Sequence, residues 1–269
     1  MTIRSAVALA AFSSALFAAT PAWAASYTWT GVIRDFCGGA SGCPQGFAAH
    51  PDFQAGISGG VVTGIVQSTL GGDGKPVFQG AANSFVQNAA SFNQWFNDTA
   101  GVNQSQNFGI LMNDPLNTGI FTYTNNNFFP IDGALLGNQG RNHNFHFTYE
   151  LSGLFGYKAG TNQTFSFTGD DDVWVFINNK LAIDLGGVHG AATGSVNLDT
   201  IAGTFGLANN QNYNISIFFA ERHTTQSNFS IQTSLEIREV NEIPEPSTYA
   251  LMLAGLGMLG FMARRRLRD

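Results

Sequence analysis

Short runs in which hydrophobic and polar residues alternate fill most of the chain between residues 26 and 239. In residues 144–150, Phe145, Phe147 and Tyr149 fall on one face of an extended segment, and the polar residues between them fall on the other, as a half-buried strand requires. Similar runs occupy residues 27–34, 60–67, 108–113, 119–124, 163–169, 172–178, 213–221 and 228–237. Because turn-forming Gly, Asn and Asp separate these runs, the pattern predicts a mainly β fold, an antiparallel β-sandwich or rolled sheet with one or two short helices.

One segment has a helical period instead. Phe85, Phe92 and Phe96 recur at spacings that place them on one side of a helix. We therefore expect an amphipathic helix over residues 84–97, with Ser84 as its N-cap.

The N-terminal residues 1–24 differ in composition from the rest of the chain. Arg4 precedes a short apolar run, which ends in a small-x-small cleavage site at Ala24. This order is typical of a secretory signal, and the run is too short and too rich in Ser and Ala for a membrane-spanning helix. We expect export and cleavage after Ala24.

The C-terminal residues 242–269 combine three unlike features. Pro244-Glu245-Pro246 enforces an extended backbone, residues 250–263 form an apolar helix, and a cluster of arginines follows, which the positive-inside rule keeps cytoplasmic. A simple C-terminal anchor is the alternative interpretation. The order of the three features resembles the PEP-CTERM sorting signal of exported bacterial proteins. The resemblance implies that a membrane-embedded exosortase cuts at or near Pro244, Glu245 and Pro246, so that the helix anchors the chain in the inner membrane only before processing.

Between the two ends no stretch is rich enough in Pro or Ser to mark a linker, so we expect one domain over residues 25–241. Of the 269 residues, 44% are hydrophobic and 11% are charged, which is enough apolar surface for a core. The net charge is −6, and removal of the expected ends leaves 7 basic and 15 acidic residues, or about −8. This charge argues against nucleic acid as a partner and favours cations or neutral sugars.

The chain has two cysteines, Cys37 and Cys43. In an exported protein such a close pair predicts a disulfide that closes one loop, with a contribution of about 2 kcal/mol in the chain-entropy model. A zinc or redox role would need a CxxC pair or histidines at ligand spacing.

Three consecutive carboxylates, Asp170, Asp171 and Asp172, precede residues 173–177, which are apolar on both faces and predict a central strand. Adjacent carboxylates repel one another unless a cation lies among them, and oxygen ligands suit Ca²⁺. In an extended strand Asp170 and Asp172 share one face, whereas a cis peptide between neighbouring aspartates would bring those two side chains together. A solvated acidic turn would use the same residues, so both interpretations stay open.

The acidic segment belongs to a longer set of motifs that resembles the fibro-slime domain. These motifs are residues 169–190 and 218–229, with Arg34-Asp35-Phe36, His50-Pro51-Asp52-Phe53, Gly74-Lys75-Pro76-Val77, residues 128–133 and residues 143–150 before them. The match spans nearly all of the expected mature chain. The family is similar to the protective-antigen-type β-sandwich, a non-catalytic glycan-binding module of adhesins, toxins and sugar-processing enzymes.

In the lectin members of that group, two adjacent aspartates joined by a cis peptide hold Ca²⁺, and the Ca²⁺ holds sugar hydroxyls. The resemblance places this pair at Asp170 and Asp171. Asp172 stands where the lectins have glycine, so the register Asp171-Asp172, or a role for all three, stays open. Asp184 is a further candidate metal ligand.

The loop ligands of the lectins have no clear counterpart in this chain. The candidate ligand-binding residues are Asn178, His189, Arg222, His223 and Asn228. For the segment Glu221-Arg222-His223 an ion pair or a loop brace is the competing interpretation, and for His189 it is a turn histidine bonded to its own backbone.

Three patterns typical of enzymes lack their structural context. Residues 56–60 match G-x-S-x-G, but a strand pattern rather than a helix follows them. His143 and His146 would point to opposite faces of the predicted strand. Asp170 and Asp172 lie on one short segment, whereas glycosidase carboxylates usually come from different elements across a cleft. We therefore expect no enzymatic activity.

Together these features predict an exported module, at the cell surface or in the extracellular matrix, that uses Ca²⁺ to recognise a glycan or exopolysaccharide. A structural matrix protein that assembles with itself and binds no sugar also fits the abundant Asn, Gln and Gly and the aromatic strands.

Overall fold

A computed structural model of the protein describes residues 25–39 and 42–238, so the expected signal sequence and the sorting tail with its apolar helix lie outside the described residues. Its elements are β1 (Ala25–Phe36), α1 (Ala89–Asn93), β2 (Asn103–Asp114), β3 (Phe121–Asn125), β4 (Phe147–Tyr157), β5 (Thr164–Asp170), β6 (Asp172–Ile177), β7 (Lys180–Leu185), β8 (Ala192–Asn197), α2 (Leu198–Phe205), β9 (Gln211–Glu221) and β10 (Asn228–Thr233). In these ranges no helix has the length and apolar character needed to cross a membrane.

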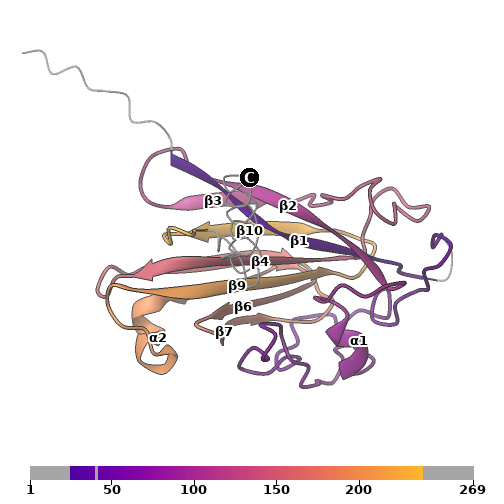
Figure 1. The fold of residues 1–269 in the computed structure, drawn as a ribbon, viewed down its shortest axis with the longest axis horizontal. Coiled ribbons are helices and arrows are strands. Elements are labelled where there is room, and N and C mark those ends of the chain that lie inside the picture. Colours follow the sequence, from indigo (N-terminus) through magenta and orange to yellow (C-terminus); the bar gives the residue numbers. More distant parts are fainter. Residues whose placement is uncertain (1–24, 40–41, 239–269) are drawn as a thin grey trace, which may run out of the picture.

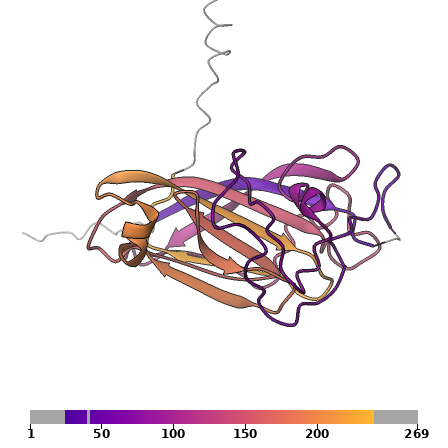
Figure 2. The same cartoon turned by 90° about the horizontal axis from the view of Figure 1, so that it is seen from below.

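Ten strands of the described chain form one antiparallel sheet in the order β7-β6-β9-β4-β1-β2-β3-β10-β5-β8. The sheet folds over on itself into two layers (Figures 1 and 2), and its first and last strands, β7 and β8, come into contact. The predicted mainly β, antiparallel fold is confirmed. A nearly closed sheet leaves few unpaired strand edges, which protects an aromatic-rich chain from edge-to-edge association.

The main core fills the space between the two layers. The inward residues of the long strands supply it, among them Trp29, Tyr149, Phe167, Phe219 and Phe229, each at most 1% exposed. The alternation seen in the sequence therefore marks the inner face of the sheet.

A second core lies on the outer face of β6 and β9. On β6, Val173 and Val175 face the main core, whereas Trp174 and Phe176 belong to the second cluster. A largely irregular segment with α1, drawn in purple in Figure 1, supplies the aromatic residues that cover them, including Trp95. This cover explains why β6 is apolar on both faces, as a strand paired on both sides by β7 and β9 should be.

The expected helix over residues 84–97 is wrong in its extent. Only α1 is helical, and Asn88, not Ser84, caps it, because the Asn88 side chain accepts hydrogen bonds from the backbone N–H groups of Ala90 and Ser91. Phe85 has a φ of 52°, in the left-handed region, which ends any helix before Asn88. The helical spacing of the aromatic residues therefore extends beyond the helix itself.

The strand expected over residues 60–67 is also wrong, since this segment forms just one isolated bridge, between Val66 and Phe78. Its apolar residues instead cover the outer face of β6, where Ile65 and Val66 are buried. The alternation pattern missed β7, β8 and α2, because β7 and β8 carry small or mixed side chains whose alternation is weak.

Candidate functional site

The acidic triplet lies where four strands end or begin. β5 ends at Asp170 and pairs with Asn228 at the start of β10, while Asp172 opens β6 opposite Ala220 near the end of β9. The Asp170–Asp171 peptide bond is cis. The triplet is therefore held by the sheet itself and is no free turn: the three carboxylates are between 0% and 4% exposed.

A pocket of about 280 Å³ opens beside the first two aspartates. Its lining comes from three loops and the triplet: Ile57, Gly59, Asp170, Asp171, Val188, His189, Gly190, His223, Thr225 and Gln226. Asp172 is not part of the lining. The structure thus separates the triplet into a pair that borders the pocket and a third residue that turns inward.

Both carboxylate oxygens of Asp170 interact with Asn228. The backbone N–H of Asn228 donates to Oδ1, and the Asn228 side-chain amide donates to Oδ2 at 2.8 Å. Burial raises the pKa of Asp170, and the two bonds from Asn228 oppose that rise. Asn228, a predicted ligand contact, therefore orients the first aspartate.

Asp171 and Glu221 form a buried acidic pair behind Asp170. The Arg222 backbone N–H donates to Asp171 Oδ2 at 2.8 Å, and the His223 N–H donates to Glu221 Oε1 at 3.2 Å. Burial raises the pKa of Asp171 well above its usual value, and Asp172 adds to the rise; the pKa of Glu221 is raised by burial and by Asp171 and Asp170. Glu221 Oε2 is buried and meets no full hydrogen-bond geometry among the described residues, although the Ser227 hydroxyl opposes the rise of the Glu221 pKa.

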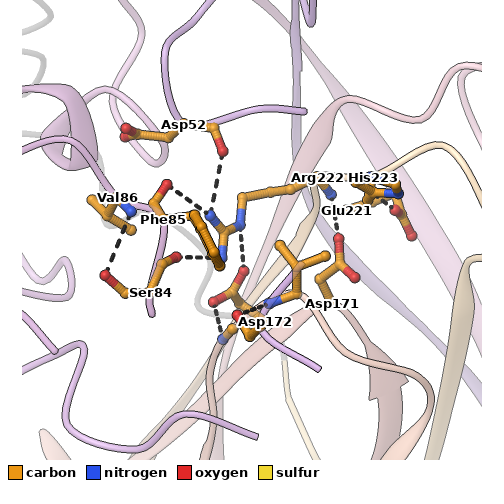
Figure 3. A network of polar contacts seen from close by, with 12 residues as sticks. Asp52, Ser84, Phe85, Val86, Asp171, Asp172, Glu221, Arg222 and His223 are labelled. Atoms are coloured by element: carbon orange, nitrogen blue, oxygen red, sulfur yellow. Dashed lines mark hydrogen bonds and ion pairs between the residues drawn. The ribbon is translucent and has the colours of Figure 1, made fainter. Parts of the chain in front are cut away.

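The third aspartate pairs with a buried arginine (Figure 3). Arg222 Nε donates to Asp172 Oδ2 at 2.6 Å, and both side chains are 0% exposed. The other carboxylate oxygen accepts the Gly187 N–H. The guanidinium also lies over the Trp95 ring, 4.8 Å from its centre. Asp172 is thus committed to structural partners, which accounts for an acidic residue where the lectins carry glycine.

The same guanidinium ties the covering segment to the sheet. Its Nη1 donates to the backbone oxygens of Asp52 and Phe85, and its Nη2 donates to that of Ser84 at 3.1 Å. Figure 3 shows these bonds radiating from Arg222 toward two separate stretches of the segment. Arg222 therefore acts as the loop brace that was the competing interpretation of its segment, and it does not line the pocket.

The predicted histidines both line the pocket, and three of their four ring nitrogens have a partner in the structure. His189 Nδ1 lies 2.7 Å from Gly190 O and Nε2 lies 3.2 Å from Leu185 O, so this ring does bond nearby backbone, as its alternative interpretation holds. His223 Nε2 lies 3.2 Å from the side chain of Gln54, and burial lowers the His223 pKa.

Two predicted residues lie away from the pocket. Asp184 accepts hydrogen bonds from Trp174 Nε1 at 3.0 Å and from the Gly64 N–H at 2.8 Å, and burial raises its pKa. Asn178 follows the opposite end of β6, where its side chain donates to Phe205 O. Neither residue is part of the pocket lining.

Over residues 25–39 and 42–238, no group of three or more His, Cys, Asp or Glu side chains is arranged to hold a metal ion. The groups that fit a hard cation are the Asp170 and Asp171 carboxylates, which border the pocket. Ca²⁺ completes its coordination with carbonyl, water or ligand oxygens. Two protein carboxylates at an open pocket are compatible with that mode of binding.

Sequence reasoning missed two contributions to the site. The sequence places Glu221 in a segment suited to an ion pair or a loop brace but gives no sign that it neighbours the aspartates, and nothing in the local pattern indicates that Ile57 and Gly59 line the pocket. The alternation of β9 could have placed Glu221 beside the triplet, because Glu221 ends the strand that pairs with β6.

The predicted disulfide is confirmed: Cys37 and Cys43 are bonded, with their Cα atoms 5.6 Å apart. The bridge closes a loop next to β1. Gly38 in this loop packs directly on the His146 ring. The Gln54 side chain bridges two histidines, with Oε1 at 3.2 Å from His146 Nε2 and Nε2 at 3.2 Å from His223 Nε2. The disulfide loop therefore supports the region behind the pocket.

A second hollow lies at the other end of the sheet. It has a volume of about 490 Å³ and a largely polar lining that includes Ala25 at the start of β1, Tyr157 at the end of β4, Asn212 near the start of β9 and Arg238. β9 has 11 residues between this end and the aspartates, which corresponds to about 34 Å.

Two family models match the chain. Residues 119–248 match the PA14 domain, and residues 242–266 match the PEP-CTERM protein-sorting motif. The chain is therefore similar to the PA14 domain over its C-terminal half and to the PEP-CTERM motif in its tail, and the resemblance to a lectin-like β domain with a sorting signal is confirmed.

The chain is similar to several proteins of Dictyostelium discoideum. It is 44% identical to protein psiQ over 200 residues, 40% identical to psiR over 205 residues and 35% identical to psiC over 210 residues, which corresponds to 69%, 70% and 72% of this chain. The aligned region spans 20% of psiQ, 20% of psiR and 40% of psiC.

Among solved structures, the PA14 domain of the MpAFP antifreeze protein is 10% identical, with a TM-score of 0.31 over 85% of this chain and 90% of that one. The PA14 sugar-binding domain from an RTX adhesin is 10% identical, with a TM-score of 0.30 over 78% and 95%. The Epa9 A domain from Candida glabrata, solved with Galb1-4GlcNAc, is 15% identical, with a TM-score of 0.31 over 81% and 93%. Scores this low carry no functional argument.

Proposed function

We propose that this chain is an exported, non-catalytic sugar-binding module in which Asp170 and Asp171 hold Ca²⁺, and the Ca²⁺ coordinates hydroxyl groups of a surface or matrix glycan. The observation that supports this most directly is the pair of buried, adjacent carboxylates that borders a pocket of about 280 Å³. The PA14 domain match supports the same class of function.

A bound cation would offset the negative charge of the buried carboxylates at the pocket. Burial raises the pKa of Asp170, Asp171 and Glu221, and neighbouring carboxylates add to the rise for Asp171 and Glu221. Arg222, the buried cation nearby, is already paired with Asp172. A divalent ion favours the ionised forms. Both ring nitrogens of His189 and Nε2 of His223 have protein partners, so the pocket offers mainly oxygen donors, and these suit Ca²⁺ better than softer metals.

The sorting motif supports export to the cell surface. Processing by an exosortase near Pro244, Glu245 and Pro246 would separate the domain over residues 25–241 from the apolar tail. The net charge of about −8 outside the two ends favours a cation and a neutral glycan or exopolysaccharide over an anionic partner.

Calorimetric titration of the full chain with Ca²⁺ tests the metal site. We expect a binding heat that Asp170→Asn/Asp171→Asn abolishes and that the control Asp73→Asn, in an exposed turn, retains. Unchanged heats in the double variant, with unfolding curves showing that it is folded, would refute the site.

A glycan array with and without chelator tests the ligand. Hits that disappear on chelation support the proposal. A silent array together with concentration-dependent assembly would instead favour a self-assembling matrix protein, for which the Asn-, Gln- and Gly-rich sequence is the supporting observation.

A further inference from the structure

The segment that borders the aspartate pocket carries exposed apolar side chains, one of which lines the pocket. Six large apolar side chains are exposed in the described residues, and three of them, Ile57, Val61 and Phe85, belong to the segment that covers β6. Ile57 is 59% exposed and lines the pocket together with Asp170 and Asp171. Exposed apolar surface beside a polar pocket is costly in water and is typical of a contact for a ligand.

Phe85 is held outward by the buried arginine. Its φ of 52° is unusual for an aromatic residue, and its backbone oxygen accepts a bond from Arg222 Nη1 at 3.4 Å, next to the bond from Nη2 to Ser84 O. Its ring lies on Gly56, where an added Cβ would stand 2.6 Å from the ring. Phe85 is 39% exposed, and its ring lies beside Gly56, the residue before Ile57.

Ser58 fixes this arrangement to the opposite wall of the pocket. Its hydroxyl donates to Asn83 O at 2.9 Å and accepts the Val188 N–H at 2.9 Å. Its own N–H donates to Val188 O at 2.8 Å. The Phe85 stretch, the Ile57 stretch and the Val188 loop thus form one fixed rim. We call the exposed side chains of Ile57 and Phe85 the apolar ledge.

We propose, building on the sugar-binding function above, that the apolar ledge contacts a methyl group of the bound sugar. The ligand class is then a methyl-bearing sugar, a 6-deoxyhexose or an N-acetylated hexosamine, and not a fully hydroxylated hexose. The bound ion would coordinate hydroxyl groups of the sugar. Contact between the ledge and the methyl group would remove the apolar surface of both from water. Ile57 and Phe85 are specificity-determining residues for that substituent.

Sugar pairs that differ at the methyl-bearing position test the ledge. The full chain is titrated in Ca²⁺ with L-fucose against L-galactose, and with N-acetylglucosamine against N-formylglucosamine, which lacks only the methyl group. We expect the methyl-bearing member of at least one pair to bind about fourfold more tightly or better, the value for burial of one methyl group. The pair that responds identifies the substituent.

Variants separate the ledge from the metal. Phe85→Ala and Ile57→Ser should remove the preference, and Phe85→Ala should leave Ca²⁺ affinity unchanged because Phe85 does not line the pocket. Leu116→Ala, which removes an 80% exposed side chain elsewhere, should leave both the preference and the Ca²⁺ affinity unchanged. Phe85→Asn removes the ring with a residue that tolerates positive φ, so its loss of preference cannot come from backbone strain.

Equal affinities within both sugar pairs would overturn the ledge and leave Ca²⁺-dependent sugar binding intact. Retention of the preference in Phe85→Asn and Ile57→Ser would overturn it as well. Absence of any Ca²⁺-dependent sugar binding would overturn the proposed function and the ledge together.

Discussion

Asp172→Asn leaves the Arg222 guanidinium buried without its counter-ion. The two side chains are 0% exposed and meet at 2.6 Å, so water cannot replace the lost charge. Removing one partner of such a pair typically costs about 3–5 kcal/mol in the free energy of unfolding. Arg222→Leu should cost at least as much, because it also removes three bonds to backbone oxygens and the contact with Trp95.

The double variant Asp172→Asn/Arg222→Leu removes both charges. It should lose less stability than the sum of the single variants, with a coupling energy of about 2 kcal/mol or more, since neither single variant retains a paired charge. Urea unfolding followed by the fluorescence of the buried Trp95 and Trp174 measures these values, and a constant m-value shows that the midpoints are comparable.

An ion pair with an exposed carboxylate provides the control. Arg34 bonds Asp98 at 2.8 Å, but the Asp98 side chain is 66% exposed, so Asp98→Asn should cost about 1 kcal/mol or less. Two results would refute the bracing role of the buried pair. Either single variant costs no more stability than Asp98→Asn, or the losses of the two single variants add up to that of the double variant within about 0.5 kcal/mol.

Three further perturbations probe other parts of the fold by urea unfolding. Burial raises the pKa of Asp35 from 3.8 to about 7, so the folded chain holds the extra proton between these values and stability falls as the pH rises through that window. This fall in the free energy of unfolding amounts to up to about 4 kcal/mol, and Asp35→Asn should abolish it. Parallel pH profiles for the wild type and Asp35→Asn would contradict the prediction. Gly31→Ala should cost about 3 kcal/mol or more, because its Cβ would overlap a backbone oxygen of β4, while Gly60→Ala, with open space around it, should cost little. Cys37→Ser/Cys43→Ser should cost about 2 kcal/mol, and a reductant should then destabilise the wild type but not the variant.

The strands with strong alternation could be predicted from the sequence because one of their faces is buried in the main core. β6 could be recognised as well, since Trp174 and Phe176 need a second apolar cover. The helix over residues 84–97 could not be bounded, because the Phe85 backbone is set by Arg222, which lies far away in the sequence. Local spacing carries no information about such a partner.

The site could be predicted in part for the same reason. The adjacent aspartates and Asn228 are local or motif-borne signals, and the structure brings them together. The inward turn of Asp172 depends on pairing with Arg222, and the wall at Ile57 depends on the covering segment, so neither follows from one stretch of sequence.

Ala25 and Arg238 border the same hollow, at the end of the sheet remote from the acidic pair. The PEP-CTERM motif follows Arg238 in the chain. A protein tethered through that motif would thus be held at the hollow, with the aspartates about 34 Å further out along β9. In this orientation many neighbouring copies would present their pockets to one ligand surface, so that weak individual contacts add up through avidity.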